Sequence, residues 1–325
     1  MSGSLSGSTL SPCHIADARF IVTIDGDGTL WDDAYKTDLS GSSALLGLLP
    51  RVREAGGIAG LNSSRSFASL QAFAHHQVGV PHGQLLALLP LTVAENGAYA
   101  VGPFSWFDEV MDDDHSILWN IRPGQVTGAF LALRQELAGF CRDRGWSFME
   151  TLPSLFVSQN RKACFPQAYG IVVFIDNSRA LSFGCEVRLV RDHFMQPPGE
   201  DVQATREVLA FLSQFTADRF GVPVTFIPLT YQGLSQGSVS CLLSSARKGS
   251  ALQALLRQLA PGVPIYHIGN GYSDQVLAGT GRIYSIAVAN AVPELRQAAW
   301  RVTEQPWALG VAEALRHILS GYWAP

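Results

Sequence analysis

Two aspartates, Asp25 and Asp27, are separated by one glycine and follow a short apolar run, Phe20 to Ile24. Carboxylates this close repel each other unless a cation lies nearby, and a hard divalent ion such as Mg²⁺ fits their charge and their oxygen ligands. An Asp-Gly turn between two strands is the alternative, because glycine permits the positive φ that such turns need. By itself the pair is compatible with both interpretations.

A second polar group follows the next predicted strand, Ile58 to Leu61. Ser63, Ser64 and Arg65 come after it, directly before an apolar pattern at helical spacing that begins at Phe67. A hydroxyl at a strand end, next to the free backbone N–H groups of a starting helix, is suited to binding phosphate. An ordinary serine N-cap would look the same and is the alternative.

Lys248 is one of only three lysines in the chain. It begins a helix predicted from leucines at positions 252, 255, 256 and 259, which Pro261 ends. A lysine at this end is unfavourable for the helix dipole, which favours a special role for it. A solvated surface lysine is the alternative.

A glycine-rich loop follows the apolar run Ile265 to Ile268 and contains Asn270, Ser273 and Asp274. Its oxygens could serve a metal ion, although an amide brings no charge. His267 lies within the apolar run, and we expect it to be a core histidine whose hydrogen bonds are satisfied.

Together these groups resemble the four signatures of the haloacid dehalogenase (HAD) superfamily, in order and spacing. Asp-Gly-Asp-Gly-Thr-Leu from Asp25 resembles the first, and Ser63 with the two residues after it resembles the second. Lys248 with its following glycine resembles the third. The loop from Gly269 to Asp274 resembles the fourth, usually written Gly-Asp-Gly-x-Asn-Asp.

The fourth signature departs from the pattern at two positions, where Asn270 replaces an Asp and Ser273 replaces an Asn. The metal would then be held by fewer anions and more weakly, with Asp274 carrying more of the binding. The tetrapeptide from Glu95 to Ala98 also resembles the Cof-like and sucrose-phosphatase-like branch, in which a large cap lies between the second and third signatures.

The resemblance implies a role for each residue. Asp25 is expected to be the nucleophile and Asp27 the general acid and base, while Ser63 and Lys248 hold the transferring phosphoryl oxygens. The residues expected to hold Mg²⁺ are Asp25, Asp27 through its carbonyl, Asn270 and Asp274. The residues expected to contact the substrate are Ser64, Arg65, Asn96 and Ser273.

The order of the predicted helices and strands that must position these residues differs between the two ends and the middle of the chain. Both ends alternate strand and helix, which is typical of a parallel sheet with helices on its faces. The middle reads as helix, two strands, helix, two strands, and this order favours an α+β layer. Its predicted helices cover Val126–Arg142 and Val202–Phe220, and its predicted strands cover Ile171–Ile175, Glu186–Val190, Val224–Ile227 and Val239–Leu243.

The expected fold is therefore α/β: a Rossmann-like parallel-sheet HAD core with an inserted α+β cap domain. We predict a disordered tail over residues 1–15, a core formed by residues 16–98 and 244–325, and a cap over residues 99–243. At 325 residues with 47% apolar content, the chain is long enough for two such domains.

Composition narrows the possible partners. A net charge of −4 offers no basic surface for nucleic acid, and no apolar run approaches the roughly 20 residues of a membrane span. Five scattered cysteines without Cys-x-x-Cys spacing argue against disulfides and zinc. We expect a soluble cytoplasmic protein, a monomer or homodimer.

The resemblance implies a Mg²⁺-dependent phosphatase that hydrolyses a small phosphomonoester, such as a sugar phosphate, through an aspartyl-phosphate. A phosphomutase similar to phosphomannomutases is one alternative. A binding protein that kept the fold but lost turnover is another, and the substitution at Asn270 keeps it open.

Overall fold

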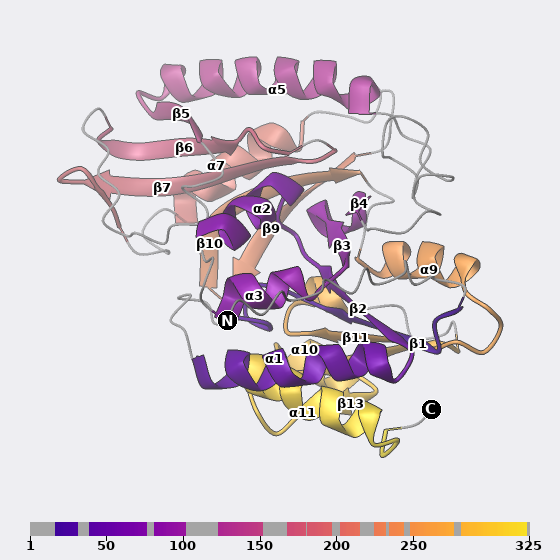
Figure 1. The fold of residues 1–325 in the computed structure, drawn as a ribbon. Coiled ribbons are helices and arrows are strands. Elements are labelled where there is room, and N and C mark those ends of the chain that lie inside the picture. The colour runs from indigo at the N-terminus through magenta and orange to yellow at the C-terminus, as the bar shows by residue number, and fades with distance from the viewer. Residues whose placement is uncertain are drawn as a thin grey trace, which may run out of the picture.

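The computed structural model describes residues 17–31, 39–76, 81–101, 123–151, 168–179, 181–196, 202–214, 224–231, 234–243, 248–275 and 281–323. These residues form two sheets, each with its own helices. The first sheet and its helices occupy the lower part of Figure 1, and the second sheet lies above them beneath α5. The predicted tail, residues 1–15, lies outside the described residues.

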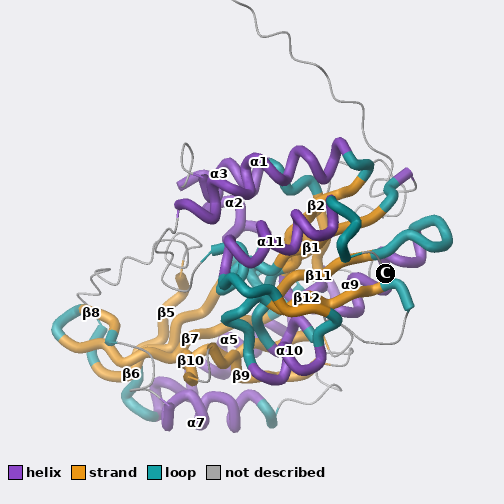
Figure 2. Tube along the Cα trace, turned by 90° about the horizontal axis from the view of Figure 1, so that it is seen from below, coloured by secondary structure: helices purple, strands orange, loops and turns teal. Residues whose placement is uncertain are grey.

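The first sheet takes strands from both ends of the chain, in the order β13-β12-β11-β1-β2-β3-β4. All neighbours pair in parallel except β3 and β4, which are antiparallel. Figure 2 shows β2, β1, β11 and β12 side by side in this order. The strands are β1 (Phe20–Ile24), β2 (Gly57–Asn62), β3 (Leu91–Ala94), β4 (Tyr99–Val101), β11 (Ile265–Gly269), β12 (Ile283–Ala287) and β13 (Arg301–Val302).

Helices cover both faces of this sheet, because alternate residues of each strand are apolar on opposite sides. Val22 and Ile24 of β1 belong to a buried cluster with leucines of α1 (Leu39–Glu54) and residues of α11 (Trp307–Leu319). Ile21 belongs to a separate cluster with α9 (Lys248–Gln258) on the opposite face. The shorter helices around this sheet are α2 (Phe67–His76), α3 (Pro81–Ala87), α10 (Pro293–Ala298), and the 3-10 turns η2 (Glu95–Gly97) and η3 (Tyr272–Asp274).

The second sheet is built from one contiguous part of the chain, in the order β5-β6-β7-β10-β9, with β8 pairing β7. Only β5 and β6 pair in parallel. The strands are β5 (Ser147–Thr151), β6 (Gly170–Asp176), β7 (Phe183–Arg191), β8 (Phe194–Met195), β9 (Val224–Tyr231) and β10 (Leu234–Leu243).

Two helices, α5 (Pro123–Asp143) and α7 (Val202–Leu212), lie against one face of the second sheet. Leu133 and Leu137 of α5 share a buried cluster with Val208 of α7 and with apolar residues of β6 and β7. Figure 1 shows α5 as the outermost element on that side.

The middle of the chain differs from its prediction in two details. Helix α7 ends at Leu212, where the prediction continued, and Ser213 and Gln214 form a turn; residues 215–220 of the predicted helix lie outside the described residues. There the Ser213 hydroxyl donates to the carbonyl oxygen of Leu209, a local bond that competes with helix continuation. Strand β5 was not predicted, because its sequence, Ser-Phe-Met-Glu-Thr, carries little of the β-branched signal of β6.

The predicted fold class is confirmed: a mostly parallel α/β sheet with helices on both faces, plus an inserted α+β layer. The exact domain boundaries remain a prediction. Strand β4 pairs β3 and so extends the first sheet to Val101. Among the described residues, no helix has the length and apolar content that a membrane span requires.

Candidate active site

The predicted site residues follow the carboxyl ends of neighbouring parallel strands. Asp25 follows β1, Ser63 follows β2, and Asn270 follows β11. Strand β1 lies between β2 and β11, so the chain leaves β1 in one direction and returns on its other side. This arrangement is a topological switch point, where open α/β sheets hold their ligands.

Lys248 connects two of these strand ends. Its Nζ lies 2.6 Å from Oδ1 of Asp25 and 2.7 Å from Oδ1 of Asp274. The lysine side chain is only 2% exposed, and both carboxylates are also buried. Three segments that are remote in sequence thus meet at one ammonium group.

Burial and charge act against each other in this cluster. Burial first and then the charge of Asp274 raise the pKa of Asp25, Lys248 partly opposes both, and the pKa lies at about 7. Burial lowers the pKa of Lys248, but the carboxylates of Asp25 and Asp274 more than offset that effect and leave it above its ordinary value. The lysine is therefore held as a cation.

Asp274 is enclosed by donors on both oxygens. Oδ1 accepts hydrogen bonds from Lys248 Nζ and from His267 Nε2 at 3.0 Å, and Oδ2 accepts from the backbone N–H groups of Asn270 and Gly271 at 3.1 and 2.8 Å. Burial raises the pKa of Asp274, but Lys248 first and then His267 lower it well below its ordinary value. A Cβ at Gly269 would lie 2.3 Å from Cγ of Asp274, so glycine is needed there for this carboxylate to fold back over the strand.

Asp27 has a different set of partners. Arg65 donates to it twice, from Nε to Oδ2 and from Nη2 to Oδ1, each at 2.8 Å. The indole Nε1 of Trp31 donates to Oδ1 at 2.8 Å. A Cβ at Gly26 would lie 2.7 Å from the Trp31 ring, so this glycine makes room for the indole. The predicted contact of Arg65 with substrate stays a prediction, and here its guanidinium holds Asp27.

Ser63 and Asn96 are joined by a hydrogen bond next to the segment that contains Asp25 and Asp27. The backbone N–H of Asn96 donates to the carbonyl oxygen of Ser63 at 3.0 Å, while Oγ of Ser63 accepts the N–H of Arg65 at 3.1 Å. A Cβ built at Gly26 would lie 3.5 Å from Oγ of Ser63, so this hydroxyl lies beside the glycine that separates Asp25 from Asp27. Asn96 is buried, has a φ of +58°, and its Nδ2 has no hydrogen-bond partner among the described residues.

The side-chain oxygens of Asp25 and Asn270 fit one Mg²⁺ ion, although only the aspartate brings negative charge. Oδ1 of Asn270 accepts one hydrogen bond, from Thr29 Oγ1 at 3.1 Å, and an amide oxygen has a second lone pair. Oδ2 of Asp25 makes no hydrogen bond within the described parts of the chain. Mg²⁺ commonly binds through one or two carboxylates and completes its shell with phosphate and water. Within the described ranges, no three His, Cys, Asp or Glu side chains form a metal cluster.

Two further predicted site residues, Asp274 and Ser273, lie in or next to the loop that follows β11. The four hydrogen bonds to Asp274 use the roughly four lone-pair sites of a carboxylate, so in this structure it serves Lys248 and the loop backbone. Its predicted role as a metal ligand stays a prediction. Ser273 lies exposed on η3, near the same loop.

A turn of the second sheet rests on the site, a feature that the sequence did not reveal. Arg179, which follows β6, pairs with Asp176 at 2.9 Å and donates from Nη1 to the carbonyl oxygen of Ser64 at 3.0 Å. Oε2 of the buried Glu95 accepts the N–H of Leu181 at 2.9 Å and the hydroxyl of Ser182 at 2.8 Å. The sequence offered little signal for this contact, because Glu95 directly follows the apolar strand β3 and reads as part of a turn.

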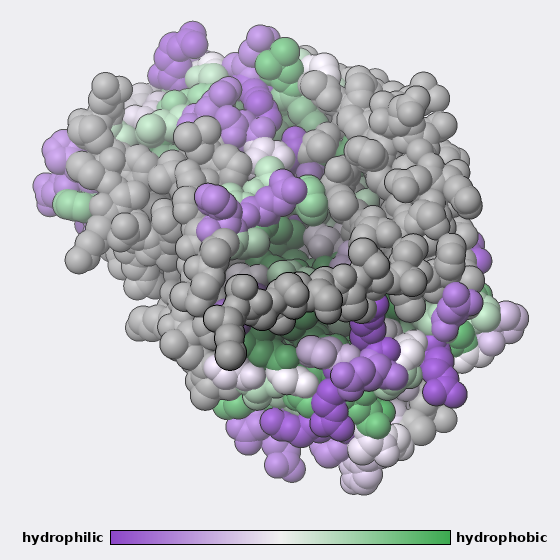
Figure 3. Space-filling model, viewed as in Figure 1, coloured by the Kyte–Doolittle hydropathy of each residue, from purple (hydrophilic) through white to green (hydrophobic). Residues whose placement is uncertain are grey.

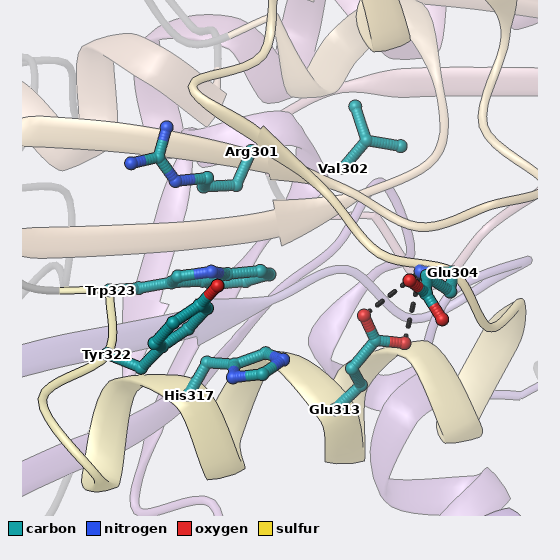
Figure 4. A pocket seen from close by; sticks show the side chains of 7 residues that line it. All are labelled: Arg301, Val302, Glu304, Glu313, His317, Tyr322 and Trp323. Carbon is teal, nitrogen blue, oxygen red and sulfur yellow. Dashed lines mark hydrogen bonds between the residues drawn. The ribbon is translucent and has the colours of Figure 1, made fainter.

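A hollow of about 600 Å³ lies elsewhere, at the outer edge of the first sheet (Figure 4). The rings of His317, Tyr322 and Trp323 line one side of it, and Glu313 accepts the backbone N–H of Glu304 on the other. None of the predicted site residues lines it. On the face of the molecule drawn in Figure 3, hydrophilic residues gather along the lower edge of the molecule.

The chain matches no described protein family, and no curated protein matches its sequence. Solved structures do match. A haloacid dehalogenase-like hydrolase from Bacteroides thetaiotaomicron has a TM-score of 0.55 and 17% identity, over 92% of this chain and 99% of its own. The HAD subclass IIB sugar phosphatase BT4131 has a TM-score of 0.51 and 13% identity, over 92% and 98%. A structure described as a putative HAD/COF-like hydrolase from Plasmodium vivax has a TM-score of 0.51 and 16% identity, over 94% of this chain and 96% of its own. The chain thus has the fold of HAD-like hydrolases, as predicted.

Proposed function

We propose that this chain, which has the fold of HAD-like hydrolases, is a Mg²⁺-dependent phosphatase that acts on a small phosphomonoester. The observation that carries this proposal is Lys248, whose ammonium joins Asp25 and Asp274 at 2.6 and 2.7 Å inside a buried switch-point site. A nucleophilic carboxylate beside a fixed cation is the arrangement that phosphoryl transfer requires.

In the first step, Asp25 attacks phosphorus. The hydrogen bond from Lys248 to Oδ1 orients the carboxylate for this attack. The bond between phosphorus and the leaving oxygen breaks, that oxygen takes a proton from Asp27, and Asp25 becomes an aspartyl-phosphate. Lys248 and the Ser63 hydroxyl bind the phosphoryl oxygens as negative charge develops on them.

In the second step, Asp27 takes a proton from water, and the water oxygen attacks phosphorus. The bond between phosphorus and Asp25 breaks, which releases phosphate and restores the carboxylate. Arg65 and Trp31 fix the orientation of Asp27 for both transfers, because Arg65 donates to both of its oxygens and Trp31 donates to Oδ1.

Mg²⁺ would be held by Asp25, the Asp27 carbonyl, Asn270 and, as predicted from the sequence, Asp274. When bound, the ion offsets the repulsion between the nucleophile and the phosphate. The donor set contains few uncommitted anions, so substrate phosphate is expected to contribute much of the metal affinity.

A sugar phosphate is the proposed substrate, with Ser64, Arg65, Asn96 and Ser273 as candidate contacts. Support comes from the likeness in fold to a structure described as a sugar phosphatase, and from the inserted layer whose turn reaches Ser64. An insert in this position can close over the substrate, exclude water and select the leaving group.

The test is phosphate release from a panel of phosphomonoesters, with Mg²⁺ and with EDTA. We expect turnover with Mg²⁺ only, and we expect beryllium fluoride, a mimic of the aspartyl-phosphate, to inhibit it. A phosphomutase would isomerise a sugar phosphate without releasing phosphate. If the purified protein leaves the whole panel unchanged and trapping reagents never label Asp25, the alternative of a binding protein replaces this proposal.

A further inference from the structure

His267 occupies a position in the first sheet that links two site residues. Strands β1 and β11 pair in parallel with Thr23 opposite His267. Thr23 and Asp25 lie two residues apart, so their side chains leave β1 on the same side. That side is the one covered by α9, as the cluster containing Ile21 and Ile265 shows. His267 therefore lies on the face from which Lys248 reaches the site.

Both ring nitrogens of His267 are engaged, and the ring is fully buried. Nδ1 lies 2.9 Å from the hydroxyl of Thr23, and Nε2 lies 3.0 Å from Oδ1 of Asp274. An ionised carboxylate only accepts hydrogen bonds, so Nε2 must carry the proton that faces Asp274. In the neutral ring Nδ1 then accepts from the Thr23 hydroxyl, and this bond fixes the tautomer.

The result is a continuous buried chain of contacts from Thr23 through His267, Asp274 and Lys248 to Asp25. Every contact in it runs between side chains, unlike the usual buried histidine that bonds to backbone. Asp274 sits on a short 3-10 turn, and the only side chains that donate to it in the described structure are Lys248 and His267. Two backbone N–H groups hold its Oδ2, and His267 helps to keep its Oδ1 turned toward Lys248.

We propose that His267 is a positioning residue of the phosphoryl-transfer site, acting through Asp274 to hold Lys248 against Asp25. This inference rests on the proposed function. Asn270 brings no negative charge to the loop, so Asp274 and Asp25 are the two carboxylates that fix the lysine. A donor that holds Asp274 in one orientation thus keeps the ammonium where the phosphoryl oxygens arrive.

The kinetic test compares His267→Leu with His267→Gln, whose side-chain amide can still donate to Asp274. In His267→Leu we expect kcat to fall by roughly 10- to 100-fold with KM nearly unchanged, as is common when a group that orients a site residue is lost. His267→Gln should recover most of that loss. A core residue with only a filling role would not distinguish the two variants in kcat at equal thermal stability.

Thr23 supplies a second, milder test in case His267→Leu does not fold. Thr23→Val keeps the shape but removes the hydroxyl that fixes the imidazole, so kcat should fall while Thr23→Ser stays near the original enzyme. Thermal melting of all four variants separates loss of folding from loss of positioning. Equal kcat in Thr23→Val and Thr23→Ser would count against the proposal.

The tautomer can be measured without any turnover. Proton–nitrogen correlation spectra of the labelled full chain should show a proton on Nε2 of His267, and Asp274→Asn should shift that signal. A proton on Nδ1 alone overturns the inference. If the unaltered enzyme releases no phosphate, the proposed function fails, and the role of His267 fails with it. If it turns over and folded His267→Leu matches its kcat, only the role of His267 fails.

Discussion

The two sheets show two ways of building a region from a chain. The first joins strands more than 200 positions apart, since Thr23 of β1 pairs with His267 of β11, and the predicted site lies where those strands end. The second is contiguous, and its strands are nearly all antiparallel. The first sheet buries charged groups at its carboxyl edge, among them Asp25, Lys248 and Asp274, whereas the second leaves a pair such as Arg144 and Glu207 exposed.

The candidate active site therefore lies in the region whose charged groups are buried, and the second region has charged groups that are open to solvent. Buried charges in the first region interact strongly because little water screens them. Charges on the rim of the second region are solvated and contribute little. The contrast yields five predictions, which run from the largest expected effect to the smallest.

Asp25→Asn should abolish phosphatase activity, with a loss of roughly four orders of magnitude, as for other essential nucleophiles. Thermal stability should change little, because Lys248 keeps its ion pair with Asp274. Phosphate release and thermal melting measure the two effects. Activity close to that of the original chain would show that the nucleophile lies elsewhere.

Lys248→Met should lower the free energy of unfolding by roughly 3–5 kcal/mol, because it leaves two buried carboxylates without their cation. Arg144→Met in the second region is the matched control. It breaks an exposed ion pair and removes the guanidinium that lies 3.7 Å from the centroid of the Phe140 ring, so the expected loss is only about 1–2 kcal/mol. Urea unfolding of both variants provides the measurement, and equal losses would contradict the contrast between the regions.

The pH dependence of stability near neutrality should also become steeper in Lys248→Met. In the original chain the raised pKa of Asp25, about 7, already makes stability rise as the pH falls from 7 toward 3.8. In the original chain the pKa of Asp274 is lowered, so its contribution to stability is present above the ordinary value of 3.8 and is lost as the pH falls further. Without the lysine, burial favours the protonated form of Asp25 and Asp274 in the folded state. The variant should therefore gain more stability than the original chain as the pH falls from 7 toward 5.

Glu95→Gln should loosen the turn of the second sheet that rests on the site. Glu95 Oε2 accepts two hydrogen bonds from Leu181 and Ser182, and a charged acceptor is worth more than an amide. We expect a cost of about 1–3 kcal/mol, seen as faster hydrogen exchange at the Leu181 amide. Glu186→Gln, at a partly exposed pair within the second sheet, should leave that amide unchanged.

The smallest effect is expected at Cys141 of α5. Burial raises the pKa of its thiol to about 12, so iodoacetamide at pH 8 should not label it in the folded protein. Labelling should begin only when denaturant opens the second region, which makes this thiol a reporter for that region alone. Rapid labelling without denaturant would show that α5 detaches readily.

Much of the first region could be predicted, because short apolar runs ending in polar residues mark buried parallel strands and their ligand edge. The meeting of Lys248 with Asp25 and Asp274 follows from the order of the four motifs. The partners of Asp27 could not be predicted, because nothing in sequence spacing says that Arg65 turns toward it. The contact between Arg179 and Ser64 joins segments 115 positions apart without any shared motif.

The strand order of the first sheet also sets a sequence of events during synthesis. Strands β1, β2 and β3 leave the ribosome early, but the neighbour of β1 on its other side, β11, follows only after the whole second sheet has been made. Until then one edge of β1 has unpaired backbone groups, a state prone to wrong pairing. The inserted sheet, whose strand pairings among the described residues are all internal, can fold during that interval, so the nascent chain completes the candidate active site last.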